Sequence, residues 1–151
     1  DMDYEIIPGI PAYVEAAAQL KTELTAPGQV QSVVLTRTSF GSTPMPEGED
    51  LKTFAETGAT LVIHLSIRRL NYIYRELSPI LGDDAFVAVL YRIGWPDQQI
   101  IVDRLDKIAS RVREKKITRT ALIITGKNFK KKSDINSVLY DENCHHLFRP
   151  K

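Results

Sequence analysis

Four short segments of the chain are almost continuously apolar and rich in β-branched residues. They cover 32–36, 60–65, 85–91 and 120–125. Runs of this length and composition are typical of strands that are covered on both faces. A shorter strand is predicted at 98–102, after the turn-forming sequence GWPDQ. The pattern therefore predicts a sheet of about five strands whose interior strands are buried.

Apolar residues recur at helical spacing, every three or four positions, in the segments between these strands. Pro27 and Gly28 are expected to stop the first of these helices, and Gly58 ends a shorter one. Ser66 occupies a plausible N-cap position. Strands that alternate with helices predict the α/β class, with a mixed sheet flanked by helices. The predicted helices cover 13–24, 49–57, 67–81 and 103–115.

The composition favours a single ordinary domain. The chain has 151 residues, of which 43% are hydrophobic and 26% charged. Its 20 basic and 19 acidic residues nearly cancel, so no overall charge steers it toward nucleic acid or membranes. The single cysteine, Cys144, cannot form an internal disulfide, and no stretch approaches the ~20 apolar residues of a membrane span. We therefore expect a cytoplasmic protein, and the strand-like start DMDYEIIPG suggests a part of a longer chain.

Several local sequences resemble known chemical motifs only superficially. The CHH sequence at 144–146 lacks the ligand spacing of a zinc site, so we expect no metal. Gly126 and Lys127 follow a predicted strand, but the spacing of a phosphate-binding loop is missing, which favours a solvated basic loop. No sequence motif for a nucleophilic serine or cysteine is present. His64 lies within a predicted strand, where histidine is more often structural than catalytic.

Arginines follow several of the predicted strands. Open α/β sheets bind ligands at the carboxyl ends of their strands, which here are the sequences LTRTS, IHLS, LYRIGWP and ITG. Arg37, Arg68 and Arg92 lie in or directly after these ends. Any one of them could be solvated or paired with a carboxylate, but together they suit a polyanion, because guanidinium groups bind carboxylates with two hydrogen bonds. The residues alone thus predict an α/β domain with a site for an anionic small molecule.

Longer motifs resemble the tetrapyrrole methylase superfamily over nearly the whole chain up to about residue 127. They are EIIPGIPAYVEAAAQL, LTRTSFGSTPMPEGEDL, GATLVIHLS, VAVLYRIGWPDQQII and ITRTALIITG. The loop sequence TPMPEGED and the YRIGWPDQ sequence most resemble the C11-methyltransferase branch, which acts on precorrin-4 or cobalt-precorrin-4 in cobalamin biosynthesis. This resemblance implies an S-adenosylmethionine-dependent C-methyltransferase, a homodimer whose protomer has two α/β domains with the cofactor between them. Residues 1–151 would then be the C-terminal domain, without the N-terminal one.

The resemblance also implies roles for individual residues. Substrate binding, to an anionic tetrapyrrole, is implied for Arg37, Ser39 and His64, with the loop 39–48 shaping the trough. The implied reaction is direct displacement of the methyl group by a ring carbon, with no metal and no covalent enzyme intermediate. No general base is identified. Binding of S-adenosylmethionine is implied for Pro11, Ala12, Leu65, Tyr91, Arg92, Thr120, Ala121 and Leu122.

Two alternatives remain open from the sequence. A sister C-methyltransferase of the same pathway would share the cofactor motifs and differ in the trough loop. A non-catalytic binding or regulatory module would not bind the cofactor. The sequence also leaves open whether the substrate contains cobalt.

Overall fold

A computed structural model describes residues 2–26, 28–39 and 44–127 and contains one five-stranded mixed sheet. The strand order is β1-β2-β5-β3-β4. β1 and β2 are parallel, whereas the β2–β5, β5–β3 and β3–β4 pairs are antiparallel. The predicted fold class is confirmed. The strands are β1 Val33–Arg37, β2 Thr60–His64, β3 Phe86–Tyr91, β4 Gln99–Arg104 and β5 Ala121–Thr125.

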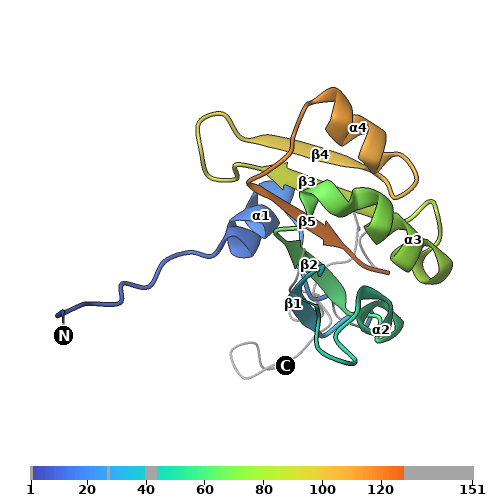
Figure 1. The fold of residues 1–151 in the computed structure, drawn as a ribbon, viewed down its shortest axis with the longest axis horizontal. Coiled ribbons are helices and arrows are strands. Elements are labelled where there is room, and N and C mark those ends of the chain that lie inside the picture. The colour runs from blue at the N-terminus through green and yellow to red at the C-terminus, as the bar shows by residue number, and fades with distance from the viewer. Residues whose placement is uncertain (1, 27, 40–43, 128–151) are drawn as a thin grey trace, which may run out of the picture.

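The two faces of this sheet are covered unequally (Figure 1). Helices α2, α3 and α4 contribute buried residues to the larger core cluster on one face, whereas α1 packs over the smaller cluster on the other. β2 is buried along its first four residues, as its continuous apolar sequence requires. The helices are α1 Ala12–Leu20, α2 Leu51–Glu56, the 3₁₀ turn η1 Ile67–Arg69, α3 Leu70–Leu81 and α4 Ile108–Glu114.

The first helix ends earlier than its sequence pattern predicts. Lys21 adopts a left-handed conformation with φ 51°, and its N–H and that of Thr22 bond to carbonyls of the last helical turn. Leu24 therefore leaves the helix, and its carbonyl accepts a hydrogen bond of 2.7 Å from the hydroxyl of Thr60 at the start of β2. The prediction of a helix to residue 24 was wrong because this tertiary contact replaces the last turn.

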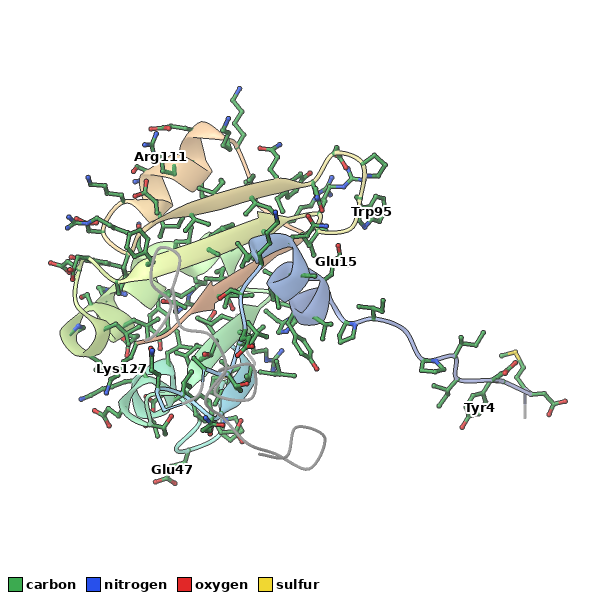
Figure 2. The ribbon with its side chains drawn as sticks, turned by 180° about the vertical axis from the view of Figure 1, so that it is seen from behind. Tyr4, Glu15, Glu47, Trp95, Arg111 and Lys127 are labelled. Carbon is green, nitrogen blue, oxygen red and sulfur yellow. The ribbon has the colours of Figure 1, made fainter. Side chains whose placement is uncertain are left out.

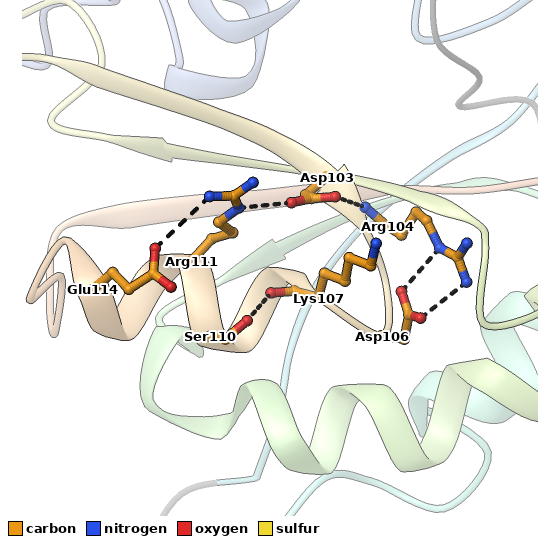
Figure 3. A network of polar contacts seen from close by, with 7 residues as sticks. All are labelled: Asp103, Arg104, Asp106, Lys107, Ser110, Arg111 and Glu114. Carbon is orange, nitrogen blue, oxygen red and sulfur yellow. Dashed lines mark hydrogen bonds and ion pairs between the residues drawn. The ribbon is translucent and has the colours of Figure 1, made fainter.

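The predicted helix 103–115 also begins later, because its first residues extend β4. Asp103 accepts hydrogen bonds from the backbone of Arg104 and from Arg111 of α4, and these contacts lower the pKa of its carboxyl (Figure 3). The guanidinium of Arg104 binds Asp106 through two contacts of 2.9 and 3.0 Å. Such exposed ion pairs stabilise proteins by no more than about 1 kcal/mol each, so the network mainly fixes the turn between β4 and α4.

Residues 2–11 form an arm without helix or strand that extends away from the sheet (Figure 1). Figure 2 shows Tyr4 far out on this arm. The strand-like composition of this segment thus forms no strand here, since none of the described strands lies beside it to supply the hydrogen bonds. None of the helices among the described residues is long and apolar enough to cross a membrane.

Candidate functional site

Three strands end and two begin at the same edge of the sheet. The register pairs Arg37 with His64 in parallel and Tyr91 with Ala121 in antiparallel orientation. The carboxyl ends of β1, β2 and β3 therefore lie at the same edge as the amino ends of β4 and β5. The expectation that the ITG sequence shares this edge was wrong, because β5 runs in the opposite direction and Gly126 lies at the far edge. The residues before β5 take its place.

This edge contains a pocket of about 560 Å³ with mainly apolar walls and a basic rim. Its apolar part includes Leu65, Ile67, Leu90, Ala121 and Leu122, and Ala12 contributes from the start of α1. A pocket of this size and character is typical of small-molecule sites. Five arginines also line it: Arg37, Arg68, Arg69, Arg92 and Arg119.

The backbone around the pocket is strained at three neighbouring positions. Leu65, Arg92 and Thr120 have φ angles of 54°, 47° and 52°, in the left-handed region that costs L-residues about 1–2 kcal/mol each. All three directly follow or precede a strand of this edge and line the pocket. The N–H of Arg92 donates a hydrogen bond of 2.9 Å to the carbonyl of Thr120, which couples two of them. Strain of this kind clusters at functional sites.

The hydroxyl of Ser66 holds the ends of β1 and β2 together. Ser66 is buried, and its oxygen accepts hydrogen bonds of 2.8 and 3.0 Å from the N–H and the hydroxyl of Thr38. It donates in turn to the carbonyl of His64, at 2.6 Å. Ser66 occupies the predicted N-cap position, at the start of η1, but its side chain makes no capping hydrogen bond to that turn. These contacts instead fix the backbone on both sides of Leu65, whose side chain is 83% exposed.

The arginines of the pocket differ in their contacts. Arg92 forms an ion pair of 2.9 Å with Asp97, and its guanidinium lies 4.3 Å from the ring centre of the exposed Trp95. Trp95 lies at the tip of the loop between β3 and β4 (Figure 2). Arg68 donates to the carbonyl of Thr118 at 3.0 Å. Arg69 donates to the carbonyl of Ser39 at 2.9 Å and stacks over Tyr72.

His64 lies between this pocket and a second, smaller hollow. The second hollow is also lined by Arg37, Met45 and Glu49. Burial lowers the pKa of the His64 imidazole, because desolvation disfavours the charged form. Burial thus favours the neutral imidazole, which is able to accept a hydrogen bond.

All of the predicted site residues line the main pocket except Pro11, Ser39 and Tyr91. Pro11 is the N-cap of α1, and Tyr91 packs against the larger core cluster. Ser39 lies beside the pocket as the hydrogen-bond partner of Arg69. The roles of all these residues stay predictions, because placement alone does not assign them.

The sequence reasoning missed Thr38, Arg69, Trp95 and Arg119. Arg69 could have been found as the neighbour of Arg68, and Arg119 precedes a predicted strand. Placing Arg119 at the pocket requires knowing that the strand after it is antiparallel to its neighbours, and the sequence of that strand does not show this.

Within the described ranges, no group of three or more His, Cys, Asp and Glu side chains is placed to hold a metal ion. The CHH sequence at 144–146 and the basic run after Lys127 lie outside these ranges.

Comparison with known proteins identifies the family. The model of the tetrapyrrole (corrin/porphyrin) methylases matches residues 1–109. The chain belongs to the tetrapyrrole methylase family. The precorrin-4 C(11)-methyltransferase of Sinorhizobium sp. is 42% identical over 97% of this chain and 58% of its own length. The cobalt-precorrin-4 C(11)-methyltransferase of Methanocaldococcus jannaschii is 40% identical over 98% of this chain and 57% of its own.

A solved structure agrees with this assignment to the tetrapyrrole methylases. That of a cobalt-precorrin-4 methyltransferase, a cobalamin biosynthetic enzyme, superposes with a TM-score of 0.79 at 32% identity. The match covers 84% of this chain and 53% of the solved chain. The chain thus spans little more than half the length of the relatives it matches.

We expect the Ser66→Ala substitution to lower the free energy of unfolding by about 1–3 kcal/mol, because the buried N–H of Thr38 loses its acceptor. Ser110→Ala is the matched control. The hydroxyl of Ser110 also donates to a carbonyl, at 2.7 Å, but on the exposed surface of α4, and its loss is expected to cost no more than about 0.5 kcal/mol. Chemical denaturation of both variants tests this, and equal losses would contradict the role of Ser66.

Proposed function

We propose that this chain is the C-terminal part of an S-adenosylmethionine-dependent methyltransferase that methylates C11 of precorrin-4 or cobalt-precorrin-4. The observation that carries the proposal is a mainly apolar pocket with an arginine rim at the sheet edge, in a chain 40–42% identical to enzymes of that name. The enzyme named for precorrin-4 and the enzyme named for cobalt-precorrin-4 are about equally similar to this chain in sequence, so the proposal includes both substrates.

The pocket fits the adenosine part of the cofactor. An adenine ring requires apolar walls and nearby backbone groups, which Leu65, Ala121 and Leu122 provide. The left-handed backbone at Leu65, Arg92 and Thr120 directs main-chain groups to positions that a regular strand end would not reach. Ala12, at the first turn of α1, would add to the apolar wall around the adenosine. These residues would hold the cofactor together with the rest of the intact protein. Pro11 and Tyr91, outside the lining, are proposed as neighbours of this site.

Arg37, Ser39 and His64 are proposed to contact the tetrapyrrole. Arg37 is exposed at the end of β1, and among the described residues it is in no ion pair, so its guanidinium is available for a substrate carboxylate. The neutral imidazole of His64 lies beside it in both hollows and can accept a hydrogen bond from the substrate.

The chemistry requires orientation more than reactive side chains. The cofactor, when bound, supplies an electrophilic methyl group. The residues of this chain would contribute by holding the macrocycle with the reacting carbon in line with that methyl, and by excluding water from the apolar part of the pocket. Placement of this kind can lower a barrier by ~7–11 kcal/mol without any proton transfer from the protein.

The intact enzyme is proposed to be a cytoplasmic homodimer. Leu35, Ile100 and Val102 are 53%, 38% and 45% exposed, and their strand partners Val62, Leu90 and Ala88 all belong to the cluster under α1. The three side chains therefore share one face of the sheet. Apolar side chains left exposed on a single face support its coverage by a second copy.

The central test is methyl transfer by the intact protein that contains this chain. We expect it to transfer the methyl group of S-adenosylmethionine to C11 of precorrin-4 or its cobalt form, and residues 1–151 alone to show no turnover, because part of the cofactor cleft is then missing. Labelled methyl transfer with product analysis by NMR measures both. Methylation at another ring carbon would identify a sister enzyme instead, and absence of both turnover and cofactor binding in the intact protein would favour a non-catalytic module.

The Ala121→Leu substitution tests the adenine wall. Ala121 lines the pocket, so a leucine there should fill space for the ring and weaken S-adenosylhomocysteine binding to the intact protein about tenfold, or ~1.4 kcal/mol. Ala109→Leu, the same enlargement at a half-buried position on α4, is the control and should leave binding unchanged. Calorimetric titration of the cofactor product, together with a thermal melt, shows whether Ala121 contacts the adenine ring or only packs in the fold. A large loss of stability in Ala121→Leu with intact cofactor affinity would make Ala121 only a packing residue.

Arg37→Ala in the intact protein tests the substrate contact. Loss of a charge-assisted hydrogen bond should weaken tetrapyrrole binding by about 1.5–3 kcal/mol, while S-adenosylhomocysteine binding stays the same. Arg75→Ala, an exposed arginine on α3 outside the pocket, serves as the control. Equal losses for both ligands in Arg37→Ala would overturn the assignment.

A further inference from the structure

The charge of the main pocket is one-sided. Five arginines line it, and none of its lining residues is acidic. Cations gathered around one mainly apolar space repel one another unless an anion binds among them, and such a site concentrates anionic ligands. The contacts of each guanidinium show which of the arginines still have hydrogen-bond donors available for such an anion.

Two of the five arginines are already engaged on more than one side. Arg92 is neutralised by Asp97 and covered on one face by Trp95. Arg69 donates to the carbonyl of Ser39 and stacks over Tyr72. Contacts of this kind hold a guanidinium in place and use part of its hydrogen-bonding capacity.

Arg68 and Arg119 lie on neighbouring segments, and within the described residues their guanidinium groups keep unused hydrogen-bond donors. The Nε of Arg68 donates to the carbonyl of Thr118, the residue directly before Arg119. This single contact anchors the side chain of Arg68 and leaves its terminal nitrogens without a hydrogen bond to the described part of the chain. Arg119 makes no side-chain hydrogen bond or ion pair within that part either.

We propose that Arg68 and Arg119 form a second carboxylate-binding site, on the side of β2 and β5, for a flat ring that bears several carboxylates. The identity of the ring as a tetrapyrrole rests on the proposed function. The mainly apolar lining of the pocket, to which Ile67 and Ile93 also contribute, suits a ring better than a free phosphate, which would need polar groups on all sides.

Binding at two separate places would fix the orientation of the ring. Arg37 is the last residue of β1, whereas Arg68 lies in η1, which follows β2, and Arg119 lies just before β5. The two sites therefore belong to different strand ends of the same edge. A ring held at only one carboxylate could rotate about that contact. A second contact selects one ring carbon for the reaction, which makes Arg68 and Arg119 specificity-determining residues.

The test measures binding of uroporphyrin to the intact protein, with coproporphyrin, the same ring with fewer carboxylates, as the second probe. Arg68→Gln and Arg119→Gln are each expected to weaken uroporphyrin binding about tenfold or more and to reduce the preference for uroporphyrin over coproporphyrin. Arg68→Lys keeps the charge but not the forked geometry, so it should also bind more weakly than the unaltered protein. Arg113→Gln, an exposed arginine of α4 outside the pocket, is the matched control and should not change binding.

Thermal melts and S-adenosylhomocysteine titrations of the same variants complete the experiment. The Arg68 side chain also anchors the segment before β5. An Arg68 variant could therefore lose porphyrin binding because it is destabilised. Arg119→Gln breaks no such contact, so its binding is then the deciding measurement. Unchanged porphyrin binding in Arg119→Gln, or a loss confined to S-adenosylhomocysteine, overturns the proposal. If C11 methylation fails in the intact protein while porphyrin binding still depends on both arginines, the carboxylate site stands and the proposed function does not.

Discussion

The buried hydroxyl of Ser66 is the contact on which the geometry of the pocket depends. It uses its full hydrogen-bonding capacity, with two donors from Thr38 and one acceptor at His64, and so joins the ends of β1 and β2. With the backbone fixed on both sides, Leu65 can keep a left-handed conformation that its side chain disfavours. Leu65 lines the pocket in this conformation.

The sheet topology brings the remaining groups to the same edge. β5 lies between β2 and β3 and runs against both, so its first residues meet the last residues of its neighbours. The hydrogen bond from Arg92 to Thr120 closes this junction. A mainly apolar floor with cations around it results, and this combination suits a flat anionic ligand beside an adenosine.

The polar contacts of the domain divide into two kinds. The network at β4 and α4 is exposed and stabilises a turn far from the pocket, where each ion pair contributes little (Figure 3). The contacts of Ser66, Arg68 and Arg69 with backbone carbonyls instead hold loops of the pocket edge in position. Cation–π contacts of Arg69 and Arg92 add to this second group. Rigidity is therefore concentrated where ligand geometry would matter.

The sequence by itself determined the five strands, the order of the elements and the family, because apolar runs and amphipathic spacing are local properties. It also indicated most of the pocket residues, since strand ends such as Arg37 and His64 are visible in the pattern. Only the tertiary structure decided that β5 is antiparallel to its neighbours. As a result Arg119, before the strand, lies at the pocket, and Gly126, after it, does not. It likewise decided the roles of Ser66 and Leu24, which looked like parts of helices. Their partners, Thr38 and Thr60, are 28 and 36 residues away, and a local pattern carries no information on contacts at that distance.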